Sequence, residues 1–204
     1  MRPKPPLRSW FVGCCTLCLL CGILGTAATA ARDEEDVDLA AGMQNGGAVL
    51  LLRHAYAPGT GDPEGFRLDD CATQRNLNDA GREQARSIGA WLRSRGIEHA
   101  RVYSSEWCRC LETAELLGLG PVTPLPALNS FFERRGDRGP TLAALEAFLE
   151  DQPPNGEPIV LVTHQVTITA LSGIYPASGE AMLMKLSDRD KGKLEPIGRM
   201  DFGP

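Results

Sequence analysis

Two of the three histidines in the chain follow short aliphatic runs, which is where catalytic side chains are expected in an α/β protein. Residues 49–52 run into Arg53 and His54, and residues 159–162 are followed, one residue later, by His164. Such runs are typical of strands buried on both faces of a parallel sheet. Because ligands bind beyond the carboxyl ends of such strands, we expect both histidines at one site. Two surface histidines that follow strands by chance are the alternative, which Arg53 beside His54 disfavours.

A second basic side chain, Arg109, is expected at the same edge. A short strand over residues 101–103 ends in Ser104 and Ser105, and Arg109 follows at the start of the next helix. A guanidinium presents a planar fork of donors that matches phosphate oxygens, and a helix N-terminus adds partial positive charge. Two arginines and two imidazoles therefore predict an anion site.

The chemistry expected of this set is covalent phosphoryl transfer. Nearby guanidiniums lower the pKa of a histidine and leave a neutral, nucleophilic nitrogen at working pH. The sequence has no carboxylate cluster with metal-ligand spacing, so we expect no metal and no cofactor, with positive side chains stabilising the transferred group. The pattern predicts a phosphohistidine intermediate.

Alternating strand and helix patterns predict an α/β fold, a three-layer sandwich with a mostly parallel central sheet and helices on both faces. The segment over residues 55–77 has no periodicity, is rich in Gly and Pro, and starts directly after His54, which favours a lid or substrate loop. The expected strands are 48–53, 101–103, 159–163, 181–186 and a weaker edge strand 194–200; the expected helices are 78–95, 108–117, 141–150 and 166–172.

The N-terminus has the order of a secretory signal peptide. Three basic residues precede the apolar residues 10–24, and small residues follow. We expect a signal peptide over residues 1–30 with cleavage after Ala30, a flexible leader over 31–47 and one domain over 48–204. The protein is then exported, in the periplasm, with no stable membrane span after cleavage. An uncleaved anchor is the alternative.

Charge and cysteine content narrow the class of protein further. The 204-residue chain has a net charge of −5 and no basic run, which disfavours nucleic-acid binding. Four of its seven cysteines lie in the signal segment, leaving Cys71, Cys108 and Cys110. Export permits a disulfide, and an odd count leaves one thiol over. We expect Cys71 to pair with Cys108.

The chain resembles the histidine phosphatase (phosphoglycerate mutase-like) superfamily over residues 48–186, and is nearest to small exported bacterial members. Each motif is weak alone, but four stand in the right order. The matching segments are Leu52-Arg53-His54-Ala55, Asn78-Asp79-Ala80-Gly81 with Gln84-Ala85, Ser104-Ser105 with Arg109 and Thr113-Ala114, and Val162-Thr163-His164.

The resemblance implies His54 as the phosphorylated nucleophile and Arg53, Arg109 and His164 as the rest of the phosphate pocket. The family usually has Gly after the first histidine, where this chain has Ala55. Because Ala is small, we expect the pocket to survive.

The remaining site residues are less constrained by pattern. The proton donor of the family is commonly a Glu in the crossing loop, which points to Glu133; a solvated charge is the other interpretation, with Asp69 or Asp70 as substitutes. Arg75 and Asn76 could reach the substrate from the long loop. Glu180 could line the pocket opposite His164 or belong to a turn.

The expected activity is phosphomonoester hydrolysis on a small-molecule or glycan-borne phosphate outside the cytoplasm. Two alternatives remain open. One is a phosphohistidine-protein phosphatase, and the other is a catalytically silent phosphate-binding module.

Overall fold

The computed structural model describes residues 40–153, 156–186 and 194–202. The expected signal peptide, its cleavage site and most of the expected leader lie outside these ranges. Within the described residues, no helix combines the length and the apolar character needed to cross a membrane.

A mixed sheet of six strands forms the centre of the domain, in the order β3-β2-β4-β1-β5-β6. β1, β2, β3 and β4 run parallel, whereas β5 pairs antiparallel with β1, and β6 pairs antiparallel with β5 at the edge. The mostly parallel sheet predicted from the sequence is therefore confirmed. The strands are β1 (Ala48–Arg53), β2 (Arg101–Ser104), β3 (Val122–Pro124), β4 (Ile159–Thr163), β5 (Ala181–Lys185) and β6 (Glu195–Met200).

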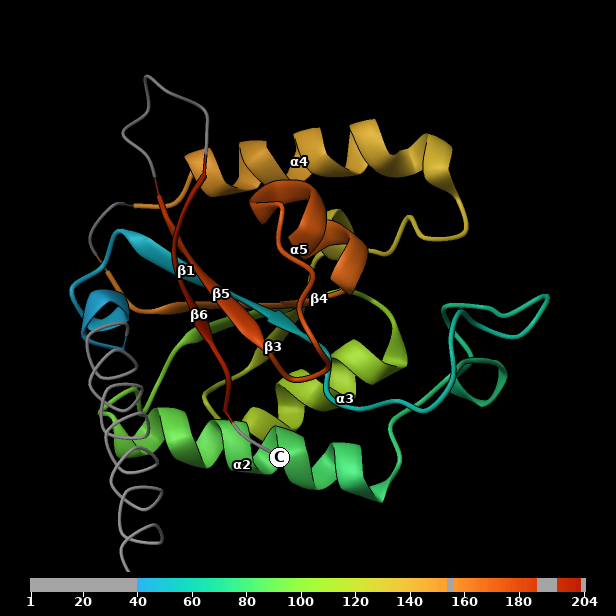
Figure 1. The fold of residues 1–204 in the computed structure, drawn as a ribbon, viewed down its shortest axis with the longest axis horizontal. Coiled ribbons are helices and arrows are strands. Elements are labelled where there is room, and N and C mark those ends of the chain that lie inside the picture. Colours follow the sequence, from blue (N-terminus) through green and yellow to red (C-terminus); the bar gives the residue numbers. More distant parts are fainter. Residues whose placement is uncertain (1–39, 154–155, 187–193, 203–204) are drawn as a thin grey trace, which may run out of the picture. The chain divides into compact units, whose positions relative to one another are not determined.

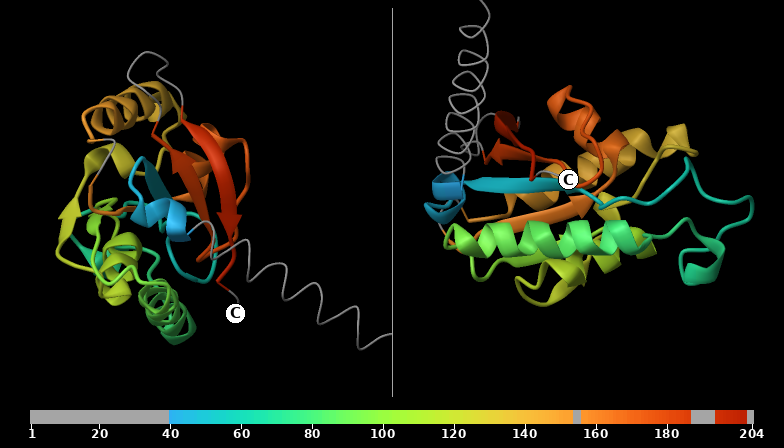
Figure 2. Two further views of the ribbon diagram at one scale, coloured as in Figure 1. Left: turned by 90° about the vertical axis from the view of Figure 1, so that its left-hand side faces the viewer. Right: turned by 60° about the horizontal axis from the view of Figure 1, so that its bottom comes forward.

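Helices cover both faces of this sheet, as Figure 1 and the rotated views of Figure 2 show. α2 (Asp79–Ser94) and α3 (Cys108–Leu117) lie on one face, and α4 (Arg138–Glu150) and α5 (Gln165–Ser172) lie on the other. Each interlayer space holds its own cluster of buried apolar side chains. β1 and β4 contribute to both clusters, which explains their continuous aliphatic sequences.

The register of β1 and β4 determines where the two histidines emerge. The strands pair in parallel, with Leu52 opposite Val162 and Arg53 opposite Thr163. His54 and His164 are the next residues of the two strands, so they leave the sheet side by side at its carboxyl edge. The segment after His54 then extends outward beyond the ends of α2 and α3 (Figure 1).

The start of α2 is packed against that segment. The Asn78 side chain accepts a hydrogen bond from the Gly81 N–H at 2.9 Å, as expected of an N-cap. A Cβ at Gly81 would lie 2.0 Å from the backbone oxygen of Tyr56, so only glycine allows this contact. The helix therefore fixes the backbone two residues beyond His54.

Three expectations about elements were wrong. Residues 40–44 are helical, with Ala40 and Met43 buried, where a flexible leader was expected. α4 begins at Arg138 rather than near 141, because Pro140 is tolerated in a first helical turn. β3 was missed because the prolines around it indicated a loop, although a short edge strand can accommodate them.

Candidate active site

His54 and His164 face each other at the carboxyl ends of β1 and β4, as the sequence predicts. Their ring centroids are 5.6 Å apart, with an angle of 69° between the rings. The backbone N–H of His54 donates to the Thr163 carbonyl at 3.0 Å, which joins the ends of β1 and β4. Both side chains are buried, with exposed fractions of 2% and 4%.

Hydrogen bonding leaves His54 Nε2 as the nitrogen with a free lone pair. Nδ1 lies 2.8 Å from the carbonyl oxygen of Ala55, which can only accept, so Nδ1 must carry the proton. Burial, and then the positive charge of Arg109, hold the pKa of His54 well below its usual value. The imidazole is therefore neutral at pH 7, as a nitrogen nucleophile requires.

The segment that carries His54 is anchored to α3. The Ala55 N–H donates to Thr113 Oγ1 at 3.0 Å, and this hydroxyl donates to the Arg109 carbonyl at 2.6 Å. Among the described residues no residue other than glycine has a positive φ, so Ala55 replaces the glycine of the family without backbone strain. The pocket is thus compatible with Ala55, as expected.

Three arginines surround the histidines. Arg109 is 3% exposed, and Arg53 and Arg75 are partly buried and line the same cavity. Burial, together with the positive charge of Arg109, lowers the pKa of both Arg53 and Arg75. The buried Nε atoms of Arg53 and Arg109 have no hydrogen-bond partner within the protein. Because buried donors of this kind are normally paired, both are available to an anionic ligand.

A hydrogen-bond chain fixes the tautomer of His164. Asn129 Oδ1 accepts from the Glu106 N–H at 2.9 Å and lies 3.1 Å from Ser105 Oγ, so the Ser105 hydroxyl donates to it. Ser105 Oγ then accepts from His164 Nε2 at 2.8 Å. Nδ1 is left without a proton, and it lies 3.5 Å from an Nη2 of Arg109.

Burial and the charge of Arg109 also lower the pKa of His164 well below its usual value. Because Nδ1 of neutral His164 carries no proton, it can accept a hydrogen bond from Arg109 or from a group bound in the pocket. Sequence reasoning did not assign a role to Ser105 or Asn129 in this arrangement.

Asp62 is the main site residue that the sequence did not reveal. Its carboxylate is 5% exposed and accepts from both terminal nitrogens of Arg109, at 2.8 and 3.2 Å. The Trp107 indole N–H and the Arg75 backbone N–H also donate to it, each at 3.0 Å. Burial alone would raise the pKa of Asp62, but these hydrogen bonds and the charge of Arg109 lower it, so the carboxylate stays ionised.

The ion pair with Asp62 fixes the orientation of the Arg109 guanidinium and offsets its positive charge. Asp62 occupies the end of the guanidinium, whereas the unpartnered Nε is on its side edge. A ligand oxygen can therefore bind that edge without displacing Asp62. Arg53, Arg75 and Arg109 carry three positive charges, and the Asp62 carboxylate neutralises one of them. The remaining two positive charges match the two negative charges of a phosphomonoester dianion.

Glu133 lies at the mouth of the same cavity. Its carboxylate accepts from the Asp62 N–H at 3.0 Å, and its side chain lines the cavity with Arg53, His54 and His164. The position is compatible with the proton-donor role expected from the sequence, which stays a prediction.

Other residues named from the sequence do not reach the cavity. Asn76 donates to the Cys71 carbonyl at 2.6 Å, and Glu180 pairs with Arg199 at 2.5 Å while accepting from the Ala177 N–H. Neither lines the cavity, so the prediction that they bind substrate is corrected: both stabilise turns.

The two substitute acids are also engaged elsewhere. Asp69 is solvent-exposed, and Asp70 pairs with Arg67 and caps the short turn that starts at Cys71. Neither lines the cavity. They are therefore not placed to protonate a leaving group.

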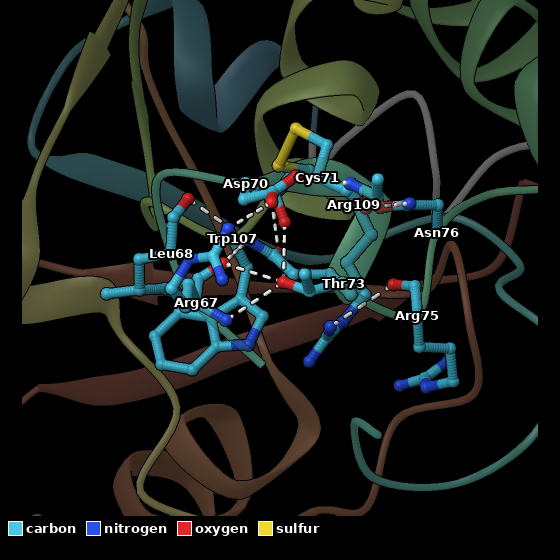
Figure 3. Close-up of a disulfide and its surroundings, with 12 residues drawn as sticks. Arg67, Leu68, Asp70, Cys71, Thr73, Arg75, Asn76, Trp107 and Arg109 are labelled. Atoms are coloured by element: carbon cyan, nitrogen blue, oxygen red, sulfur yellow. Dashed lines mark hydrogen bonds and ion pairs between the residues drawn. A yellow bond between two sulfur atoms is a disulfide. The ribbon is translucent and has the colours of Figure 1, made fainter. Parts of the chain in front are cut away.

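A disulfide joins the long loop to the first residue of α3. Cys71 and Cys108 are bonded, the pair expected from the sequence, and Cys110 is free and buried. Figure 3 shows the disulfide above Trp107 and Arg109, with Arg75 beyond them on the same loop. Burial raises the pKa of the Cys110 thiol to about 12, so this thiol is not ionised at neutral pH.

The two histidines, the three arginines, Asp62 and Glu133 line a cavity of about 650 Å³. Arginines and histidines lie together at one part of its wall, and aromatic side chains contribute to the rest. Within the described ranges, no group of three or more His, Cys, Asp or Glu side chains could hold a metal ion. The arrangement can bind a phosphate group and place a neutral imidazole nitrogen against it.

Comparison with known proteins agrees with this geometry. The family model described as "Histidine phosphatase superfamily (branch 1)" matches residues 49–136, which include Arg53, His54 and Arg109. Among solved structures, the protein histidine phosphatase SixA complexed with tungstate has a TM-score of 0.54 and 19% identity; the match covers 76% of this chain and 97% of that one. The match over residues 49–136 and the shared fold support the assignment of the chain to the histidine phosphatase superfamily.

Two further phosphatase structures match to a similar extent. A mycobacterial glucosyl-3-phosphoglycerate phosphatase in complex with VO3 has a TM-score of 0.51 and 15% identity, covering 73% of this chain and 95% of that one. A mutant phosphoserine phosphatase from Entamoeba histolytica in complex with phosphoserine has a TM-score of 0.50 and 15% identity, covering 76% and 97%. No curated protein matches the sequence.

The superfamily assignment confirms the predicted fold class and the prediction that the chain is a phosphatase of this superfamily. His164 lies beyond the residues that the family model matches, so its place in the pocket comes from the structure: the β1–β4 register and its contacts with His54, Ser105 and Arg109. The substrate is a separate question, because identities below 25% carry the fold and nothing finer.

Proposed function

We propose that this histidine phosphatase is a metal-independent phosphomonoester hydrolase that works through a phosphohistidine on His54. The observation that carries the proposal is the unprotonated Nε2 of His54 in a pocket where two arginines each keep a buried, unpartnered Nε. Arg53 and Arg109 then neutralise the oxygens of the transferred group, as a metal ion does in other phosphatases.

The reaction has two balanced steps. First, His54 Nε2 forms a bond to phosphorus while the ester P–O bond breaks, and the leaving oxygen takes up a proton. Water then attacks the phosphorus, the P–N bond breaks, and inorganic phosphate leaves. The proton lost by this water restores the acid used in the first step.

Glu133 is the proposed donor and acceptor of that proton. The support is its position on the cavity wall with His54 and His164. The carboxylate of Asp62 is committed to Arg109 and stays ionised, which makes it unsuited to donate a proton.

The proposed substrate is a small-molecule or glycan-borne phosphate outside the cytoplasm. The N-terminal sequence has the pattern of a signal peptide, and a disulfide between Cys71 and Cys108 suits an oxidising compartment. N-terminal sequencing of the protein recovered from a periplasmic extract tests this: a start near Ala31 supports export, whereas an intact N-terminus in the cytoplasm contradicts it.

A phosphohistidine-protein phosphatase is the second candidate. What favours it is the likeness to SixA, of which this chain covers 97%. Release of phosphate from a phosphohistidine-containing carrier protein, at a kcat/KM above that for any small ester, would favour this candidate over the first.

The central experiment compares wild type with His54→Ala on an activated aryl phosphate. Loss of hydrolysis in His54→Ala, with wild-type activity unchanged by EDTA, is the expected result. Activity that persists in His54→Ala contradicts the covalent step, and inhibition by EDTA contradicts metal independence. Wild type that binds vanadate without turnover would instead indicate a silent phosphate-binding module.

A further inference from the structure

The cavity is much larger than a phosphate group requires. Its volume of about 650 Å³ is within the range of pockets that enclose whole small molecules. The arginines and histidines account for the phosphate end. The side chains around the remaining space therefore select the organic part of the ester.

Four aromatic side chains contribute to the wall of the cavity. Phe66, Trp107, Phe132 and Tyr175 all line the cavity. Trp107 is rigidly held: its ring lies edge-on to His164 with centroids 5.2 Å apart, it contacts Phe66 at 5.6 Å, and its N–H donates to Asp62. Because Trp107 is only 2% exposed, it supports Phe66 and His164 from behind rather than presenting a surface to a ligand.

Two further aromatic side chains lie on the solvent side. Phe132 is 46% exposed and Tyr175 is 66% exposed, so half of the four large hydrophobic residues classed as exposed in the described chain belong to this cavity. Exposed apolar surface concentrated at a pocket marks a binding region. Bound substrate would cover these rings and recover the free energy of removing them from water.

The charged side chains on the same wall restrict the substrate in a second way. Glu64 and Glu133 line the cavity, and Arg134, which also lines it, is paired with Asp137 at 3.5 Å. The Glu64 carboxylate, and that of Glu133 once its proton has been donated, disfavour a second anionic group on the substrate, such as the carboxylate of a sugar acid or a further phosphate. An uncharged organic group is favoured.

We propose that the substrate is a phosphate monoester whose phosphate is attached next to an uncharged apolar ring, which packs against Phe66 and Phe132. The proposal rests on the proposed function, because it takes the arginine and histidine end of the cavity as the phosphate subsite. It narrows the substrate class toward ring-bearing esters and away from hydroxyl-rich glycan phosphates.

Competitive inhibition by phosphonates tests the proposal without interference from leaving-group reactivity. Methylphosphonate, benzylphosphonate and a glucosylmethylphosphonate share the same anionic head and are not hydrolysed. We expect benzylphosphonate to inhibit wild type at least about tenfold more strongly than the other two, because a ring packed on aromatic side chains gains about this factor.

Variants then locate the ring. Phe132→Ala should reduce the advantage of benzylphosphonate about fivefold or more while leaving inhibition by methylphosphonate unchanged, and Phe132→Tyr should retain the advantage. Ile197→Ala is the matched control, because Ile197 is a 49% exposed hydrophobic residue on β6 that does not line the cavity. Since Phe132 is half exposed, its truncation is not expected to unfold the domain.

The outcomes separate this proposal from the proposed function. Equal inhibition by all three phosphonates, or stronger inhibition by the glucosyl compound, overturns the ring proposal while the phosphatase assignment stands. An unchanged benzyl advantage in Phe132→Ala overturns the stacking site. Absence of inhibition by every phosphonate and by vanadate overturns the phosphate subsite itself, and with it both proposals.

Discussion

Removing the disulfide should cost this domain a large part of its stability. Cys71 and Cys108 are separated by 37 residues, and in the chain-entropy model a crosslink of that span lowers the free energy of the folded state relative to the unfolded state by about 3.8 kcal/mol. Cys71 is exposed, so Cys71→Ser loses little apolar burial, whereas Cys108 is 8% exposed and Cys108→Ser adds the burial loss of one small side chain. The loop term therefore dominates the expected loss.

The assay is equilibrium unfolding in urea without reductant, followed by tryptophan fluorescence, on wild type and Cys71→Ser/Cys108→Ser. We expect the free energy of unfolding to fall by about 3–4 kcal/mol and the urea m-value to rise, because the uncrosslinked chain expands further when it unfolds. Cys110→Ala is the matched control: it removes a thiol and keeps the disulfide, so its m-value should equal that of wild type.

Reduction of wild type provides an independent comparison. In the presence of dithiothreitol, wild type and the double variant should unfold at nearly the same urea concentration. A loss below about 1 kcal/mol in the double variant would refute the reasoning, since it would mean that the loop is already restricted in the unfolded chain.

Three further predictions concern the pocket. Asp62→Asn removes the charge that is paired with buried Arg109, so we expect the free energy of unfolding to fall by about 3 kcal/mol. The control Asp79→Asn removes an exposed pair and should cost less than about 1 kcal/mol. Equal losses in urea unfolding would contradict a stabilising buried pair. The two pocket histidines have lowered pKa values, so below about pH 6.5 the unfolded chain binds more protons than the folded chain. The free energy of unfolding should therefore decrease by up to about 2.7 kcal/mol per pH unit as the pH falls below 6.5, and it should be constant above 6.5. A flat profile between about pH 5 and 6.5 would argue against buried neutral histidines. Glu133→Gln should reduce kcat/KM for alkyl phosphates at least about tenfold more than for activated aryl phosphates, because only poor leaving groups need the proton; equal reductions would rule out the donor role.

The place of the two pocket histidines could be predicted from the sequence because their signal is local. An aliphatic run identifies a buried strand, and the carboxyl-end rule then brings His54, Arg53, His164 and Arg109 to one edge. The β1–β4 register confirms that edge. What the rule needs is only the strand ends, which a single sequence shows clearly.

Asp62 could not be predicted because its partner is far away in the sequence. It meets Arg109 across 47 residues, and the surrounding Gly-rich loop has no periodicity that fixes where any side chain points. The same reason explains the error on Glu180, whose contact with Arg199 depends on how two antiparallel strands pair. The short helix at 40–44 was missed because one turn is too short to show a pattern.

The attachment of the long loop has a consequence for turnover. Three consecutive residues at the start of α3 are each bound to it: Trp107 and Arg109 to Asp62, and Cys108 to Cys71 by the disulfide and to the Gln74 side chain by its N–H. A loop that acts as a lid has to move relative to the rest of the domain. The disulfide, the ion pair and the hydrogen bonds to α3 restrict such a movement of the long loop. We expect substrate and product to exchange through the mouth near Phe132 while the loop stays in place, so that chemistry rather than loop opening limits the rate.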